Sequence, residues 1–595
     1  MTKKQIWLLV MVLVLAAFFR FYGAVYLDCS SQGCTKSDFK LSNLKPGMPG
    51  GLFPDEAANG LDINLMQSGQ TQPFYERGNG REALFFYMLW GSVEVLGKGP
   101  WQHHIVSGLV GLLSVLLCFL FTRRLMLMGK NSFSENFENA KKSATNIALL
   151  AAFFMAVSTW HVVLSRTAFR ANLIPLFATL TMYLLLCLYQ AENKKNKLIF
   201  SLLAGASFAL GFYTYIAYRI LAPILFMVIV WPWFANGFIY QIRNYWKQFL
   251  VFLAGFAVFF YPLGKYFYTH AGSFLGRSGQ VSVFNPELNQ GNLIGAIGEV
   301  FKESVLAYFM QGDLNWRHNV SGLPFLSQLI SPFFGMALLV ALGLALVYFF
   351  RPRKFAKFWK YFLLTGWFWG MLLPVITTAE GIPHGLRSIG TIPAVFILSA
   401  IGVYWVFEHL KQIHQKIWES CKEKTKTVWD WKKDLPAYPI GYYTVKYSFK
   451  GLAVLFFVAL IVQSYSYYFV YAANSPENFY AFRSDLTVVS DYLKERCKHD
   501  STYLILDKFS VQTTDYLTSD WHGNFNDKCN VPYKQVDPEN SWDLKNLKAG
   551  DEIVFTQSSI FDIKKFKQYH PEASLRLEHR NKFGQAVLAV YEILK

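Results

Sequence analysis

Long apolar runs separated by short polar stretches recur along most of the chain. A helix needs roughly 20 mostly apolar residues to cross the hydrocarbon core of a bilayer, and runs of this length recur from Ile6 to Tyr471. The pattern predicts an all-α polytopic membrane domain over residues 1–471. Its expected helices, about eleven, lie near residues 6–25, 103–123, 145–164, 173–190, 198–218, 220–236, 248–266, 328–350, 361–378, 388–408 and 451–471.

The polar stretches between these runs indicate which loops face the cytoplasm. Cytoplasmic loops of membrane proteins are enriched in Lys and Arg. With the N-terminus inside, the basic loops 123–142, 194–197, 243–247, 351–360 and 411–450 all fall on the inner side. The first run ends in Arg20-Phe21-Tyr22 without a small-residue cleavage pattern, so we expect a retained helix and not a cleaved signal peptide.

Three large segments then lie outside, at 26–102, 267–327 and 472–595. Within the first of them, Leu84 to Leu96 is apolar but short and carries Glu94, so we expect an interfacial helix and not a span. The last segment alternates strand-like runs at 503–506, 552–555 and 586–591 with a helical stretch at 486–496. It therefore reads as a small extracytoplasmic α/β domain.

Composition supports a membrane protein and weakens a nucleic-acid role. Of the 595 residues, 53% are hydrophobic and only 16% are charged, which is too apolar for a soluble protein of this size. The formal charge of +18 comes from Lys and Arg dispersed among the loops, whereas a nucleic-acid surface gathers them on one face. We expect no nucleic-acid partner.

The cysteines give a partly independent view of topology. Cys29 and Cys34 share the first outer segment, and Cys497 and Cys529 share the last one. Disulfides form in oxidising compartments, so two pairs on the outer side fit the predicted topology. Whether Cys29–Cys34 and Cys497–Cys529 are disulfides stays open, because spacing does not prove pairing.

Two adjacent carboxylates in the first outer segment are the strongest candidates for chemistry. Asp55 and Glu56 follow Pro54 at the start of an expected helix. A carboxylate within hydrogen-bond reach of an acceptor hydroxyl can remove its proton as a general base. The alternative interpretation is that both acids only favour a helix N-terminus. No His-Glu-x-x-His, Cys-x-x-Cys, Gly-x-Ser-x-Gly or Walker A motif occurs.

Basic residues gather on the same side of the predicted membrane. A sugar that leaves a polyprenyl phosphate carrier frees a phosphate whose negative charge grows in the transition state, and arginine side chains suit that group. The alternative for any one arginine is snorkelling to the interface. The candidate phosphate-binding residues are Arg166, Arg170, Arg219, His384 and Arg387.

The long outer loop offers His318 and Asn319 as candidate substrate contacts. His318 could contact sugar or phosphate, although a structural or exposed histidine is the commoner case. Asn319-Val320-Ser321 also matches a glycosylation sequon, which is a weak signal by itself.

Several motifs follow one another in a fixed order. One N-terminal helix precedes Asp55-Glu56, and then come Gly80 to Tyr87, Thr122 to Leu125, Ser158 to Arg170 and Gly211 to Arg219. With these motifs, the first 410 or so residues resemble in order and hydropathy the GT-C superfamily of membrane glycosyltransferases. The resemblance is to the protein O-mannosyltransferase and lipid A aminoarabinose transferase branch (glycosyltransferase family 39-like).

The resemblance implies an inverting transferase with a dolichyl- or undecaprenyl-phosphate sugar donor, a site on the outer face, and Asp55 as base with Glu56 beside it. Where many members have an acid in the second outer loop, this chain has Arg166, Arg170 and Asn172. We therefore assign no cofactor and no metal ligand, and a divalent metal requirement stays open. Arg81 and Glu82 occupy the neighbourhood of a lysine found in the aminoarabinose enzymes, and are taken as substrate contacts.

The sequence thus predicts an integral-membrane glycosyltransferase that moves a sugar from a polyprenyl-phosphate donor to a hydroxyl of a protein, glycan or lipid. The alternatives are a transporter or flippase of envelope glycoconjugates, and a non-catalytic scaffold. A transporter is expected to place ionisable residues near the middle of the membrane, whereas here they gather at the outer ends of the predicted helices.

Overall fold

The computed structural model describes most of the chain, including the C-terminal sheet. Cys29, Cys34, Cys497 and Cys529 lie outside the described residues, so the question whether they form disulfides stays as the sequence left it. The described ranges are 1–27, 44–78, 80–128, 137–226, 238–275, 282–349, 355–428, 439–496, 501–519, 533–542 and 544–594.

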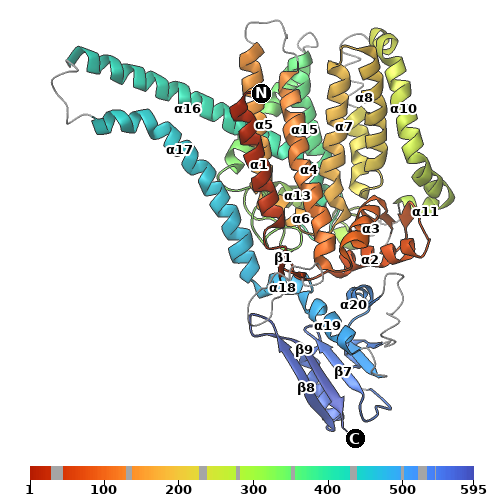
Figure 1. Cartoon of the computed structure of the whole chain (residues 1–595). Helices are drawn as coiled ribbons and strands as arrows, with labels where there is room; N and C mark the ends of the chain where they lie inside the picture. Colours follow the sequence, from red (N-terminus) through yellow and green to blue (C-terminus); the bar gives the residue numbers. More distant parts are fainter. Residues whose placement is uncertain are drawn as a thin grey trace.

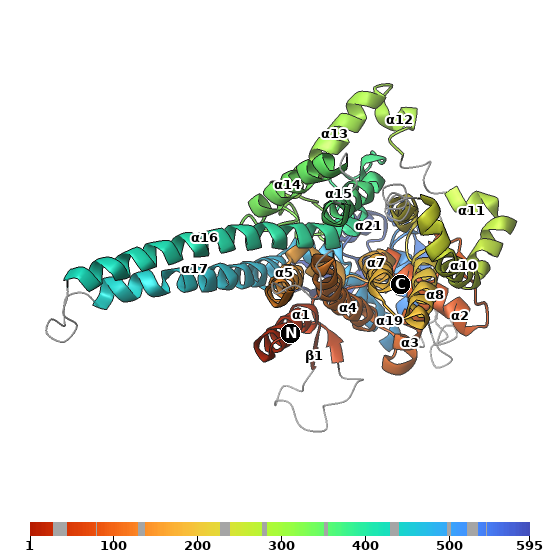
Figure 2. The ribbon, with the colours of Figure 1, turned by 90° about the horizontal axis from the view of Figure 1, so that it is seen from above.

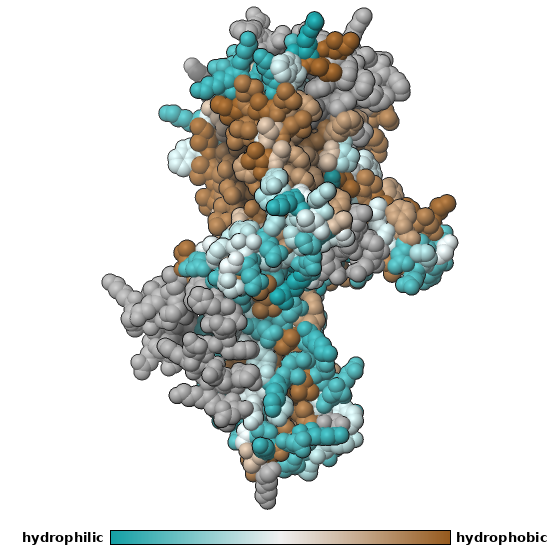
Figure 3. Space-filling model, turned by 90° about the vertical axis from the view of Figure 1, so that its right-hand side faces the viewer, coloured by the Kyte–Doolittle hydropathy of each residue, from teal (hydrophilic) through white to brown (hydrophobic). Residues whose placement is uncertain are grey.

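A bundle of long helices forms the upper body of the molecule in Figure 1. On the face shown in Figure 3, apolar side chains cover a broad band of this body, and the coloured residues below it are mostly hydrophilic. Such a band is what a bilayer requires of a spanning domain. The bundle helices are α1 (Lys3–Phe21), α4 (Pro100–Leu127), α5 (Phe137–Val157), α7 (Leu173–Gln190), α8 (Lys194–Gly211), α10 (Phe238–Thr269), α14 (Ser331–Phe349), α15 (Phe355–Ile376), α16 (Ile392–Val428) and α17 (Pro439–Tyr465).

Eight helical segments in the described part of the chain are long and apolar enough to cross a membrane, so the chain is a multi-pass membrane protein. Helices α8 and α15 are not among these eight segments, but both lie within the same bundle (Figure 1). The expected span 220–236 overlaps a short apolar helix at Ile216–Phe226, and the rest of it lies outside the described residues. The number of spans therefore remains a prediction.

The expected span 145–164 is wrong as one continuous helix. Helix α5 ends at Val157, and a second, short helix α6 (Thr159–Ser165) follows. Ser158 between them has an extended backbone, and its Oγ accepts a hydrogen bond from the backbone N–H of His161 at 3.3 Å. A serine that caps the next helix in this way ends the preceding one.

Helices α16 and α17 continue beyond the bundle as a pair that projects to one side (Figure 2). Their far ends include residues 411–428 and 439–450, which are the described parts of the basic stretch. In Figure 1 this projection starts near the end of the bundle that carries the N-terminus.

The opposite end of the bundle carries shorter helices and the C-terminal domain (Figure 1). Helix α2 (Pro54–Gln67), helix α3 (Leu84–Leu96) and helix α13 (Leu293–Leu306) are found there. Helix α3 has the bounds expected from the sequence. It buries Phe85, Phe86, Leu89 and Val93, whereas Val95 on its other face is 77% exposed.

The C-terminal segment forms the expected α/β domain. Its five-stranded sheet has the order β6-β5-β7-β9-β8, in which β5 pairs in parallel with β6 and β7, while β9 pairs antiparallel with β7 and β8. The strands are β5 (Thr502–Ile505), β6 (Lys534–Val536), β7 (Glu552–Thr556), β8 (Ala573–Arg580) and β9 (Ala586–Ile593), and the main helices are α19 (Ser484–Glu495), α20 (Val511–Thr518) and α21 (Ile563–Tyr569).

Helix α20 packs against α2, and so joins the C-terminal domain to the segment that carries the candidate acids. The hydroxyl of Tyr516 lies 2.9 Å from Nε2 of His103. The Tyr516 ring covers Gly60, where an added Cβ would come within 2.5 Å of ring carbons. Thr513 Oγ1 donates to the backbone carbonyl of Leu52 at 3.0 Å. The C-terminal domain is therefore a fixed neighbour of α2.

Candidate active site

Asp55 and Glu56 are neighbours in the first turn of α2, but their side chains have different surroundings. Pro54 occupies the first turn, where its missing N–H costs nothing. Glu56 is fully buried, and its carboxylate accepts hydrogen bonds from the backbone N–H groups of Phe53 at 2.9 Å and Ala168 at 2.5 Å. His104 Nε2 lies 3.3 Å from the same carboxylate. Glu56 thus ties α2 to the 166–172 loop.

The contacts of Glu56 also set its charge. Burial raises the pKa of the Glu56 carboxyl. Attraction to His104 and the hydrogen bonds from His104, Ala168 and Phe53 together lower this pKa by more than burial raises it. The net pKa lies below the ordinary value of 4.5. Glu56 is therefore an ionised structural group.

Asp55 points away from this buried cluster and is 47% exposed. Nη2 of Arg81 lies 3.3 Å from Asp55 Oδ1, and Nη1 of Arg81 donates to the Asp55 carbonyl and to Asn59 Oδ1, both at 3.0 Å. Arg81 itself is almost fully buried. One fixed guanidinium therefore orients an accessible carboxylate.

A small pocket opens beside Asp55 and gathers residues from four predicted segments. Asp55 and Arg170 both line it, which places a carboxylate and a guanidinium on one small cavity. The remaining lining residues are Asn59, Arg81, Phe169, Ala171, Tyr215 and Leu386. Asn59 and Tyr215 were not singled out from the sequence; Asn59, four residues after Asp55, was accessible to a helical-periodicity argument.

Glu82 is a buried bridge between two of the candidate phosphate-binding arginines. Nε of Arg170 lies 3.3 Å from one Glu82 oxygen, and Nη2 of Arg219 lies 3.2 Å from the other. Arg170 also donates to the Gly80 carbonyl at 3.2 Å and stacks over Tyr215. Arg219 lies against the rings of Phe267 and Phe274. Of the two, only Arg170 lines the pocket.

Arg166 is buried and faces the end of α1. Its guanidinium donates to the backbone carbonyls of Phe19 at 3.1 Å, Tyr22 at 3.0 Å and Met48. It also lies over the ring of Tyr468, 5.1 Å from the centroid. These contacts position the 166–172 loop against the first helix, and Arg166 is not among the residues that line the Asp55 pocket.

The long outer loop and the 383–388 loop meet around Asp313. Asp313 Oδ2 accepts hydrogen bonds from His318 Nδ1 at 2.8 Å and from the Gly385 N–H at 2.7 Å. His384 Nδ1 lies 3.9 Å from the same oxygen, and the His318 and His384 rings stack at 4.6 Å. The ligand atoms of Asp313, His318 and His384 all lie within 4.8 Å of one another.

The other residues of these two loops have internal partners. Asn319 is buried and donates to the Leu323 carbonyl at 2.5 Å. Arg387 donates to Thr378 Oγ1 at 3.0 Å and to the Glu380 carbonyl at 2.8 Å. The guanidinium of Arg317 lies 3.4 Å from the centroid of the Phe53 ring. Burial lowers the pKa of Arg317, and the nearby charges of Asp55, Glu56 and Asp313 oppose that shift.

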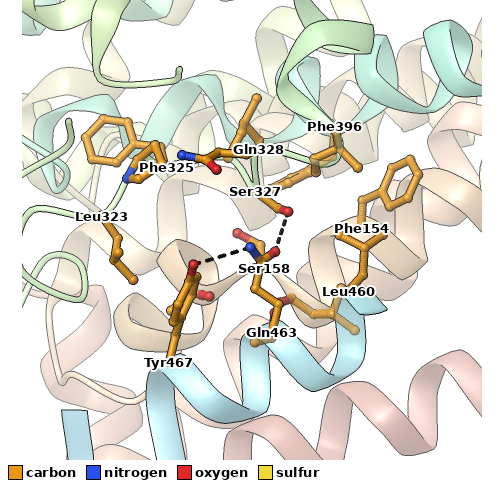
Figure 4. Close-up of a pocket in the computed structure, with 16 residues that line it drawn as sticks. Phe154, Ser158, Leu323, Phe325, Ser327, Gln328, Phe396, Leu460, Gln463 and Tyr467 are labelled. Carbon is orange, nitrogen blue, oxygen red and sulfur yellow. Dashed lines mark hydrogen bonds between the residues drawn. The ribbon is translucent and has the colours of Figure 1, made fainter. Parts of the chain in front are cut away.

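A second pocket lies inside the bundle and has a different character (Figure 4). Ser327 donates to Gln463, and Gln463 Nε2 lies 3.4 Å from the Tyr467 hydroxyl. Most of the wall is apolar, for example Phe154 and Leu460, and no Asp, Glu, Lys, Arg or His is among its described lining residues. A phosphate would find no counter-charge there, so the Asp55 pocket is the better candidate site.

No protein-family model matches the sequence, and no curated protein matches it. Among solved structures, ArnT from Cupriavidus metallidurans in the apo state is similar, with 12% identity, a TM-score of 0.49, and coverage of 98% of this chain and 97% of ArnT. Its crystal structure bound to undecaprenyl phosphate gives 11% identity, a TM-score of 0.44 and the same coverage.

An oligosaccharyltransferase from Archaeoglobus fulgidus, tethered to an acceptor peptide, is also similar, with 11% identity and a TM-score of 0.47. That similarity covers 99% of this chain and 74% of the oligosaccharyltransferase. All three TM-scores lie below 0.5, and the function is therefore inferred below from the residues of this chain.

Proposed function

We propose that this multi-pass membrane protein is a GT-C type glycosyltransferase that moves a sugar from a polyprenyl-phosphate donor to an acceptor hydroxyl at the outer face of the membrane. One observation carries the proposal: the half-exposed carboxylate of Asp55 and the guanidinium of Arg170 line the same pocket. The pocket is lined by residues of α2 and of several loops, and α2 lies at the end of the bundle opposite the N-terminus (Figure 1).

In the proposed reaction, the acceptor oxygen attacks the anomeric carbon while its proton passes to Asp55. The bond between that carbon and the phosphate oxygen breaks, and the phosphate keeps the electron pair. Attack opposite to the leaving group inverts the anomeric centre. Arg170 stabilises the growing phosphate charge, and Arg81 holds Asp55 in place.

The remaining predicted residues divide by their contacts. We assign Arg219 and Glu82 to positioning Arg170, because Glu82 bridges the two arginines. Glu56 and Arg166 hold the 166–172 loop. Leu386 lines the pocket, so we propose that the adjacent Arg387 reaches the donor phosphate once substrate binds. Asn319 shapes the outer loop through its bond to Leu323.

The proposal includes an arrangement in the membrane. Residues 1–471 form the catalytic domain with a cytoplasmic N-terminus, and residues 472–595 form the extracytoplasmic domain beside α2. The positive-inside distribution of Lys and Arg supports this orientation. The polyprenyl chain lies among membrane lipids, with its phosphate at the pocket.

Comparison of envelope glycans, glycoproteins and lipids by mass spectrometry tests the function. Cells that carry the wild-type chain should contain one sugar on one class of molecule that cells with the Asp55→Asn chain lack. Membrane levels of the two chains, measured by immunoblot, provide the control for folding. Full modification in the Asp55→Asn cells would overturn the proposal and favour the transporter, flippase or scaffold alternatives.

A further inference from the structure

Asp313, His318 and His384 bring one carboxylate oxygen and two imidazole nitrogens within 4.8 Å of one another. The three residues come from two loops, one between α13 and α14 and one between α15 and α16. Asp313 and His318 are less than 10% exposed. The orientation of Asp313 is fixed by the Asn315 N–H, which donates to Oδ1 at 2.8 Å. The donor atoms are therefore held in place before any ligand binds.

The tautomer of His384 leaves two acceptors facing each other. The backbone N–H of Arg387 points at His384 Nδ1 at 3.3 Å, so this nitrogen presents a lone pair. Nδ1 also faces Asp313 Oδ2 at 3.9 Å. A lone pair and a carboxylate oxygen repel each other unless a cation binds both.

We propose that Asp313, His318 and His384 form a binding site for one divalent transition metal ion, such as Zn²⁺, that cross-links the two outer loops. Zn²⁺ binds imidazole nitrogen and carboxylate oxygen at about 2.0–2.2 Å, and one ion can reach both atoms across the 3.9 Å gap. Two imidazoles and one carboxylate select a transition metal over Mg²⁺, which prefers oxygen ligands. This inference is independent of the proposed transfer reaction.

Metal binding requires a change of tautomer at His318. Its Nδ1 now donates to Asp313, so coordination through this nitrogen moves the single proton of the neutral ring to Nε2. The positive charges of Arg317 and Arg387 would repel a bound metal ion, but both guanidinium groups contact other residues. Arg317 contacts Phe53 and Asn315, and Arg387 contacts Thr378 and Glu380.

Gly385 makes the close approach of the loops possible. A Cβ added at this position would lie 3.1 Å from the His318 carbonyl oxygen and 3.3 Å from the His318 Cβ. The Gly385 N–H already donates to Asp313 Oδ2, and its carbonyl accepts a bond from Trp160 Nε1 at 3.1 Å. The second loop is therefore anchored at the cluster, as a metal site requires of its supporting residues.

Metal content of the purified full chain, without an affinity tag rich in histidine, tests the proposal. After stripping with a chelator, the wild-type chain should retain about one Zn²⁺ per chain on incubation with ZnCl₂ and desalting, and no Mg²⁺ from MgCl₂. Asp313→Ala and His384→Ala should lose at least nine-tenths of the bound zinc, about a tenfold drop. The control is His270→Ala, an exposed histidine directly after the end of α10, which should bind zinc like wild type.

A spectroscopic measurement covers the case in which the alanine variants misfold. Co²⁺ bound to the wild-type chain should give visible ligand-field absorption, and His384→Cys should add a sulfur-to-metal charge-transfer band, because the new thiolate joins the ion. Absence of stoichiometric zinc in the wild type, wild-type zinc content in His384→Ala, or a His384→Cys spectrum without the new band would each overturn the proposed site.

Discussion

Arg81 Nη2 lies 3.3 Å from Asp55 Oδ1, while the other terminal nitrogen of the same guanidinium donates to the Asp55 carbonyl and to Asn59. Three acceptors on one helix face are thus held by one planar group. A lysine ammonium is a compact point charge and cannot reproduce this fork. The orientation of Asp55 therefore depends on arginine at position 81.

Arg81→Lys should lower the rate of sugar transfer by about 10- to 100-fold, which corresponds to about 1.4–2.7 kcal/mol of activation free energy. The measurement is the initial transfer rate in detergent or proteoliposomes. Arg576→Lys, in the C-terminal sheet, is the matched control and should leave the rate unchanged. An Arg81→Lys chain with full activity would contradict the orienting role.

Glu82→Gln should destabilise the fold, because it leaves Arg170 and Arg219 buried without their shared counter-charge. Breaking a buried ion pair by removing one partner costs roughly 3–5 kcal/mol. The thermal unfolding midpoint of the purified chain should fall clearly. Glu94→Gln removes an acid on α3 whose hydrogen bonds with Gln67 and Trp90 are exposed to solvent, and it should have little effect. Equal midpoints for the two variants would refute the bridging role of Glu82.

Gly60→Ala should weaken the contact between α2 and the C-terminal domain. The new methyl group would meet the Tyr516 ring at 2.5 Å, and overpacking of this kind costs roughly 1–3 kcal/mol. Limited proteolysis should release the C-terminal domain faster from this variant. Gly91→Ala on α3 is the control, since nothing lies within 4 Å of its added Cβ. The same cleavage rate in both variants would contradict the packing of Tyr516 on α2.

Acid should destabilise the protein through Glu56. Its pKa is lower in the folded chain than the ordinary value of 4.5, so the folded state binds fewer protons than the unfolded one. The stabilisation is complete above pH 4.5 and is lost as the pH falls through the folded-state pKa. Below pH 4.5 the unfolding midpoint of the wild type should drop more steeply than that of Glu56→Gln. If the unfolding midpoints of the two chains fell equally with pH, ionisation of Glu56 would not contribute to the acid sensitivity of the fold.

The helical membrane domain and the α/β tail follow from local pattern. Apolar runs of bilayer length predicted most of the long helices, and the short run at Leu84–Leu96 became α3. The break inside 145–164 was missed because the apolar pattern continues through it, while the hydrogen bond from His161 to Ser158 is what ends α5.

Several residues of the site were predicted from the sequence, but the pairs that they form in the structure were not. Sequence order and charge singled out Asp55, Arg170 and Glu82, but Glu82 and Arg219 are far apart in the chain, and no local pattern indicates that they form a buried pair. The same holds for His384 and Asp313, which meet only because two outer loops fold together. Residues that share a helix face, such as Asp55 and Asn59, remain accessible to sequence reasoning.

The central claim is tested most directly by release of free polyprenyl phosphate from polyprenyl-phosphate-linked sugars incubated with the purified chain and an envelope extract as acceptor. The wild type should release polyprenyl phosphate and incorporate sugar in equal amounts. Asp55→Asn, at an unchanged unfolding midpoint, should lower both by about 100-fold or more. Equal release by the wild type and a folded Asp55→Asn chain would contradict the account.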